Sequence, residues 1–152
     1  MKLKIYWILF IGIVLCAACN NNDDETPSVT QELEGDWELV NVFGGFPGVN
    51  VNYESGLIAW DFNTEAGTLT VEGEIENDGP QSVYLPISSG TYEYAINEVN
   101  EETFLIIEGH ALHPNGEYGN YRINSEGSLV IDQGHGSETG LSDVFVIILQ
   151  RP

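Results

Sequence analysis

Short runs of alternating apolar and polar residues, separated by turn-forming residues, fill the chain from about Glu32 to Pro152. Most of them have the period of two that places apolar side chains on one face of a β-strand. Outside the N-terminal region, residues 47–55 alone are compatible with a short helical turn. The sequence therefore predicts a single all-β domain over residues 32–152 with eight or nine strands. We expect strands at residues 36–43, 57–62, 68–76, 81–87, 91–97, 103–108, 118–124, 128–133 and 143–150.

The connections between these runs are mostly short and rich in Gly, Asn, Asp and Ser, which favour turns. Two are longer, at residues 44–56 and 134–142. Sequential hairpins favour a single antiparallel up-and-down β-barrel over a two-sheet sandwich, because the sandwich usually needs longer connections at its Greek-key corners. Pairing between the first and last strands would decide between the two architectures.

Composition limits the classes of function. The chain is 42% hydrophobic and 11% aromatic, which is too apolar for a disordered acidic tail. Its length of 152 residues can bury a core without disulfide bonds. The 24 acidic and 4 basic residues give a net charge of −20. That charge repels phosphate groups, so we expect no nucleic-acid partner.

The N-terminus has the features of a secretory signal peptide. Lys2 and Lys4 precede an apolar run at residues 5–15, which is shorter than the roughly 20 residues that a transmembrane helix needs. The sequence Leu15-Cys16-Ala17-Ala18-Cys19 resembles a bacterial lipobox, although Cys16 stands where Leu is usual. The resemblance implies a signal peptide over residues 1–18 and acylation of Cys19, which would anchor the protein to a membrane. An ordinary signal peptide is the alternative.

Residues 19–31 follow as the lipidated cysteine and a flexible acidic tether. Asp23, Asp24 and Glu25 resemble the surface-export signal of Bacteroidetes lipoproteins. We therefore expect an outer-membrane lipoprotein, for which a surface-exposed and a periplasm-facing orientation both fit. After cleavage the chain would keep 24 acidic residues against Arg122 and Arg151, a net charge of −22 over 134 residues, and would have no free thiol.

The first predicted strand opens with Gly35-Asp36-Trp37, which resembles the Gly-x-Trp signature of lipocalins. The domain as a whole resembles the small lipocalin-like lipoproteins of Bacteroidetes. The resemblance implies that Trp37 closes one end of the barrel and that Arg151, after the last strand, packs over its indole in a cation–π contact. A guanidinium in that position can also bind carbonyls of the chain that crosses the barrel floor. A plain core position for Trp37 is the alternative.

Aromatic side chains are the main candidates for ligand binding. A barrel of about eight strands either holds one small ligand or fills its interior with side chains, and the sequence leaves both open. The resemblance to lipocalins implies a small hydrophobic or amphipathic ligand. The six candidate lining residues are Trp60, Phe62, Tyr92, Tyr94, Phe104 and Tyr121.

Motifs for catalysis are missing. The sequence has no nucleophile elbow, P-loop or dinucleotide fingerprint, and its exported part has no Lys. Glu72, Glu74 and Glu76 alternate along one predicted strand, about 7 Å apart. They resemble a solvent-facing surface more than the carboxylate pair of a glycosidase. We therefore expect no enzyme and no cofactor.

Metal sites have little support in the sequence. His110 and His113 lie three residues apart in a polar loop and His135 lies in another, and such residues are more often solvated than ligating. Segments 77–79 and 132–134 offer oxygen ligands without the spacing of a calcium-binding loop. We expect no dedicated metal site.

Two other classes of function remain open. One is a β-sandwich glycan-binding or adhesin module at the cell surface, which would expose Tyr53, Tyr84 or Tyr118 as flat binding platforms. The other is a hydrolase that uses acidic residues, which would need two carboxylates of raised pKa in one cleft.

Overall fold

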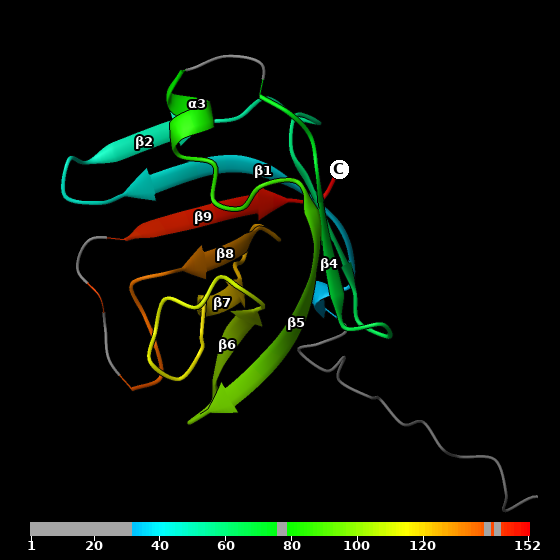
Figure 1. The fold of residues 1–152 in the computed structure, drawn as a ribbon, viewed down its shortest axis with the longest axis vertical. Coiled ribbons are helices and arrows are strands. Elements are labelled where there is room, and N and C mark those ends of the chain that lie inside the picture. Colours follow the sequence, from blue (N-terminus) through cyan, green and yellow to red (C-terminus); the bar gives the residue numbers. More distant parts are fainter. Residues whose placement is uncertain (1–31, 76–78, 139–140, 142–143) are drawn as a thin grey trace, which may run out of the picture.

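Nine antiparallel strands in one sheet make up the domain (Figure 1). The computed structural model describes residues 32–75, 79–138, 141 and 144–152, so the predicted signal peptide, Cys19 and tether lie outside the described residues. The strands are β1 (Gly35–Gly44), β2 (Val49–Asn52), β3 (Ala59–Asn63), β4 (Thr68–Glu72), β5 (Gly90–Val99), β6 (Glu102–Ile107), β7 (Gly119–Ile123), β8 (Leu129–Asp132) and β9 (Phe145–Gln150). One helical turn, α3 (Pro80–Val83), lies between β4 and β5.

The first and last strands pair and close the sheet. β1 pairs with β3 near its N-terminal end and with β9 from Glu38 to Gly44, while β3 to β9 follow one another in chain order. Strands β1 and β3–β9 therefore form a closed eight-stranded barrel, and β2 adds to β1 as a hairpin (Figure 1). This topology confirms the predicted up-and-down barrel, and it excludes the two-sheet sandwich.

Two segments differ from the predicted strands. Residues 81–87 alternate in polarity like a strand, but they form α3 and irregular chain. Pro80 favours the first turn of a helix, and Pro86 lacks the N–H that a strand ladder needs. Residues 49–52, expected within a loop, instead form β2, whose β-branched Val49 and Val51 suit a strand.

The barrel interior is filled by large apolar side chains from alternating strand positions. A bulge between Leu39 and Asn41 shifts the alternation, so Val42 rather than Asn41 is buried. The amide of Asn41 instead donates to the side chains of Asn50 and Asn52, both at 2.8 Å. The buried cluster includes Trp37, Leu39, Val42, Trp60, Phe62, Leu69, Val71, Leu105, Ile107, Tyr121, Leu129, Ile131, Ile147 and Leu149.

The two ends of the barrel are built differently. One end, here called the closed end, contains the start of β1, the end of β9 and the tight turns at residues 64–67, 100–101 and 124–128. The other end, here called the mouth, contains the β1–β2 turn at residues 45–48 and the long connections 73–89, 108–118 and 133–144. Long loops on a rigid scaffold are where binding sites are most often found, so the mouth is the first place to look for one.

Candidate functional site

Trp37 and Arg151 lie together at the closed end. The Cζ atom of Arg151 is 3.9 Å from the centroid of the Trp37 ring. Its Nη1 donates to the carbonyl oxygen of Asp36 at 3.2 Å and its Nη2 to that of Glu32 at 2.9 Å. The indole Nε1 of Trp37 donates to the carbonyl oxygen of Leu33 at 2.9 Å. The structure therefore brings together the two residues expected at the barrel end, and they hold the chain that crosses it.

Gly35 makes this arrangement sterically feasible. Its φ is +91°, a backbone conformation that L side chains rarely adopt, and a Cβ added there would lie 3.2 Å from Nη1 of Arg151. Beside it, Glu34 accepts hydrogen bonds from the hydroxyl and the backbone N–H of Thr64, the latter at 2.7 Å. These bonds hold the pKa of Glu34 below its ordinary value. The closed end is thus fastened by specific polar contacts.

The middle of the barrel is a packed aromatic core. Trp60 and Phe62 are fully buried with ring centroids 6.2 Å apart, and Phe62 meets the ring of Tyr94 edge-on at 5.2 Å. Tyr121 is also buried in this cluster. Burial raises the pKa of Tyr94 to about 12 and raises that of Tyr121 as well, so both phenols are neutral at physiological pH.

Three polar atoms of this core have no hydrogen-bond partner: Nε1 of Trp60 and the hydroxyl groups of Tyr94 and Tyr121. Such buried groups carry a desolvation penalty, which packing around them must offset. The polar atoms of these three residues are therefore buried inside the barrel without a hydrogen-bond partner.

Two of the six aromatic candidates lie elsewhere. Tyr92 is half-buried near the mouth, where its hydroxyl donates to the carbonyl of Ser88 at 2.8 Å and its ring meets His110 edge-on at 5.0 Å. Phe104 is fully buried, but it lies on the opposite face of β6 from the interior residues Leu105 and Ile107. Its ring contacts His135 outside the barrel at 5.9 Å. The expected interior position of Phe104 is therefore not found, because the alternation of β6 starts on the other face.

A segment of irregular chain covers the mouth. Residues 80–87, here called the strap, include α3 and pass in front of β1 and β9 toward β5 in Figure 1. The hydroxyl of Tyr53 lies 3.1 Å from the carbonyl oxygen of Gln81 and 3.0 Å from that of Tyr84. The side-chain amide of Gln81 donates to the carbonyl of Asn52 at 2.8 Å, and Ile87 is buried in the core. The strap is therefore attached at both of its ends.

Beneath the strap is a small, partly open cavity of about 150 Å³ that is lined by apolar side chains together with Gln133. Two of its lining residues, Val42 and Phe145, come from the mouth ends of the neighbouring strands β1 and β9. The rings of Phe145 and Tyr84 meet edge-on with centroids 5.7 Å apart, so the strap packs directly on the barrel wall. The cavity is lined by Val42, Val83, Tyr84, Leu85, Pro86, Gln133 and Phe145.

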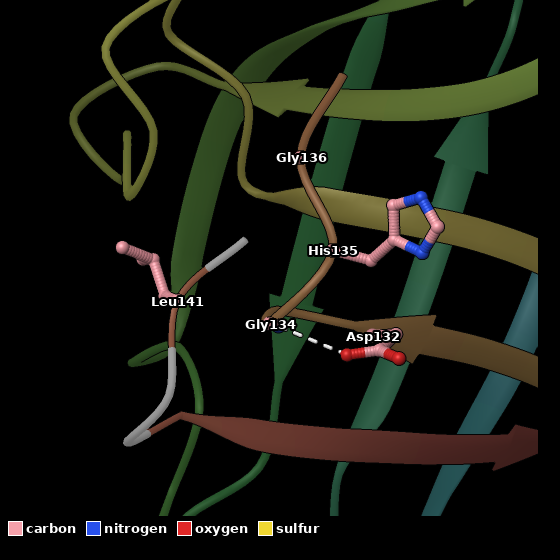
Figure 2. A pocket seen from close by; sticks show the side chains of 5 residues that line it. All are labelled: Asp132, Gly134, His135, Gly136 and Leu141. Atoms are coloured by element: carbon pink, nitrogen blue, oxygen red, sulfur yellow. Dashed lines mark hydrogen bonds between the residues drawn. The ribbon is translucent and has the colours of Figure 1, made fainter. Parts of the chain in front are cut away.

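A second hollow of about 420 Å³ lies outside the barrel (Figure 2). It is lined by Asp132, Gly134, His135, Gly136 and Leu141. The Oδ1 of Asp132 accepts a hydrogen bond from the N–H of Gly134 at 2.9 Å. Figure 2 shows the side chains of His135 and Leu141 pointing away from each other. This hollow is open and shallow, with no converging set of functional groups among the described residues.

The three histidines do not form a common site. His113 is buried, with its Nε2 3.0 Å from the carbonyl oxygen of Gln133, whereas Nε2 of His135 lies 3.3 Å from the carboxylate of Glu102 on the surface. His110 packs on Tyr92 and Tyr118. Across the described residues, no group of three or more His, Cys, Asp or Glu side chains is placed to hold a metal ion.

A buried glutamate connects two of the mouth loops, a contact that the sequence did not reveal. Glu117 is fully buried, and its carboxylate accepts hydrogen bonds from the side-chain amide of Asn97 at 3.0 Å and from the N–H of Ser137 at 2.8 Å. Burial alone would raise its pKa, but these hydrogen bonds outweigh it and hold the pKa below its ordinary value. Glu117 therefore links the 108–118 and 133–144 connections to β5 in its ionised form.

The expected row of glutamates is shorter than predicted. β4 ends at Glu72, Glu74 lies beyond the strand, and Glu76 is outside the described residues.

Comparisons with protein-family models, with curated proteins and with solved structures find no match to the chain. Among the described residues, no helix is both long and apolar enough to span a bilayer.

Proposed function

We propose that this protein is an exported, lipid-anchored, lipocalin-like domain that binds a small apolar ligand at the mouth of its barrel without catalysing a reaction. The observation that carries the proposal is the apolar cavity between the strap and the ends of β1 and β9. The fold supports it, because closed barrels of about eight strands commonly bind ligands at their mouths.

The size of the cavity limits the ligand. A cavity of about 150 Å³ lined by apolar side chains is large enough for a benzene-sized molecule. Drug-sized ligands occupy roughly 300 to 1,000 Å³. With the strap in its present position, the site therefore suits a single ring or the end of a hydrocarbon chain. A larger amphipathic ligand would insert only its apolar end, leaving its polar part in solvent.

Benzene titration tests the proposal. Because a ligand that binds only the folded state stabilises it, benzene should raise the melting temperature in a saturable way. Replacing Leu85, which lines the cavity, by Trp fills the space and should abolish the rise. Ile123→Trp is the matched control, because Ile123 is a half-buried residue near the closed end. No rise with the parent protein, or an equal loss in both variants, would contradict the proposed site.

The proposed anchor fits the direction in which the chain enters the barrel. Glu32 and Leu33 lie at the closed end, where Arg151 and Trp37 bind their carbonyl groups. A tether from an acylated Cys19 would therefore reach the domain at the closed end and leave the mouth free to meet a ligand.

Metabolic labelling of the full chain with palmitate tests the anchor. We expect the label in the parent protein and in Cys16→Ala, and its loss in Cys19→Ala, with release of that variant from the membrane fraction. Label retained by Cys19→Ala would contradict the proposal. Protease treatment of intact cells then distinguishes the two orientations of the anchored protein, because added protease reaches the cell surface but not the periplasm.

The alternative glycan-binding module loses its support. The closed barrel excludes a two-sheet sandwich. The three tyrosines that a glycan-binding module would expose are not available as flat binding platforms. Tyr53 and Tyr118 are buried, and Tyr84 packs on Phe145.

A further inference from the structure

In the part of the domain that the structure describes, the large hydrophobic side chains that are exposed all lie at the mouth. Among the described residues, five large hydrophobic side chains are exposed, and the most exposed are Phe46 at 93% and Val83 at 68%. Each belongs either to a mouth connection or to the last residues of β1. The five are Phe43, Phe46, Val83, Leu112 and Leu141, and we call them the apolar rim.

Hydrogen bonds between the loops and the packing of α3 place these residues around one opening. The N–H of Gly45 donates to the carbonyl of Val144 at 3.0 Å, which joins the β1–β2 turn to the 133–144 connection. The Glu117–Ser137 hydrogen bond joins that connection to the 108–118 connection, which contains Leu112. α3, which contains Val83, packs beside β2. The apolar rim therefore runs around the mouth through contiguous loops.

The same end of the barrel is uniformly acidic. Among the described residues, the four mouth connections contain four acidic side chains and no Lys or Arg. Of these four, Glu74, Glu108 and Glu138 are exposed, whereas Glu117 is buried. The two arginines of the barrel domain belong to the other half, with Arg122 near the end of β7 and Arg151 after β9. The mouth thus combines exposed apolar side chains with a negative field that nearby cations do not offset.

We infer that the mouth docks a cationic amphipathic segment of another polypeptide, with apolar side chains on the rim and Lys or Arg opposite its carboxylates. Charge complementarity selects this occupant. A second copy of the chain, with its net charge of −20, would repel this acidic face, and so would an anionic lipid surface. Apolar contact at the centre with charged contacts at the edge is the usual anatomy of such an interface. The inference concerns a macromolecule; of the rim residues only Val83 also lines the cavity beneath the strap.

A designed peptide pair tests the inference. The probe is a fluorescein-labelled Leu/Lys amphipathic helix of about 18 residues, roughly five turns, and the comparison is the same helix with Glu in place of Lys. Fluorescence anisotropy with the intact exported domain should show saturable binding of the Leu/Lys helix alone. Its affinity should fall at least about tenfold between about 0.05 M and about 0.5 M salt, because several charge pairs are screened.

Variants then locate the interface. Phe46→Ser combined with Val83→Ser should weaken binding at least about tenfold, since each change removes apolar contact area. Glu108→Gln with Glu138→Gln should weaken it further, whereas the closed-end control Glu65→Gln with Glu126→Gln should leave it nearly unchanged. Equal binding of the two helices, or equal losses in mouth and closed-end variants, would overturn the inference. So would rim-dependent self-association in sedimentation, or rim-dependent binding to phosphatidylcholine vesicles without binding of the Leu/Lys helix.

Discussion

The two ends of this barrel differ in the connections that join the same strands. At the closed end the connections are tight turns, and the chain entering β1 is fixed by Trp37 and Arg151 through stacking and three hydrogen bonds to carbonyl groups. At the mouth the connections are long, and a cavity and the exposed apolar side chains are found there. The difference teaches that one rigid barrel can combine an end closed by tight turns with an end of long connections, which is where binding sites are most often found.

Large aromatic truncations should separate the two ends most clearly. Trp37→Ala at the closed end removes a fully buried indole and should cost about 3–5 kcal/mol of the free energy of unfolding. Phe46→Ala at the mouth should change it by less than about 0.5 kcal/mol, because that ring is exposed. Denaturant-induced unfolding of both variants measures the difference. Similar losses would show that the ends do not differ as described.

Glu117→Gln should loosen the mouth without opening the closed end. The change weakens two hydrogen bonds of a buried carboxylate and should cost about 1–3 kcal/mol. Hydrogen exchange should rise in the 108–118 and 133–144 connections and stay unchanged near Trp37. A uniform rise across the barrel would contradict a local role.

The same residue predicts a pH dependence. Because the pKa of Glu117 is lower in the folded protein, its stabilising contribution is fully present above its ordinary value of about 4.3 and is lost as the pH falls through the lowered folded value. The parent protein should therefore lose more stability than Glu117→Gln on acidification from neutral pH to below about 4. Parallel pH profiles of unfolding free energy for the two proteins would contradict this assignment.

Replacing the two arginines one at a time tests whether the stack of Arg151 on Trp37 stabilises the closed end. Arg151→Ala removes the cation–π contact and two hydrogen bonds and should cost about 1–2 kcal/mol. Arg122 is an exposed residue near the same end, and Arg122→Ala should have little effect on stability. Thermal unfolding compares them directly, and equal effects would show that general charge balance, rather than the stack on Trp37, stabilises this end.

The smallest effect is expected at Asp61. Its pKa is raised first by burial and then by the nearby negative charges of Asp36, Glu34 and Glu72. The charged form of Asp61 is therefore less favourable in the folded protein than in the unfolded one. Asp61→Asn should therefore raise the melting temperature slightly at neutral pH, and the gain should shrink as Asp61 becomes protonated at acidic pH. A lower melting temperature at neutral pH would mean that the carboxylate makes a favourable contact.

Most of the barrel follows from its alternating pattern and turn residues. Sequential hairpins favour a barrel over a sandwich, and the pairing of β1 with β9 decides between the two. The stack of Arg151 on Trp37 was predicted from Gly-x-Trp and from the position of the last arginine, and the structure places the two side chains together.

The mouth was harder to predict. Apolar residues alternate as in a strand at Val83, Leu85 and Ile87, so the pattern predicts a strand where the strap lies. The signal against a strand is the presence of two prolines, Pro80 and Pro86. Phe104 shows a second limit, since a run in which consecutive residues are apolar does not tell which of them faces the barrel interior. The buried role of Glu117 depends on contacts between distant loops, and no local pattern in the sequence predicts it.

Methyl-resolved NMR with benzene as the probe tests the central claim most directly, because it shows which end of the barrel binds. We expect saturable shift changes at the methyl groups of Val42 and Leu85, which line the mouth cavity, and none at Leu33, which is buried at the closed end. Changes at Leu33 with none at Val42 and Leu85, or no saturable change at all, would contradict a ligand site at the mouth.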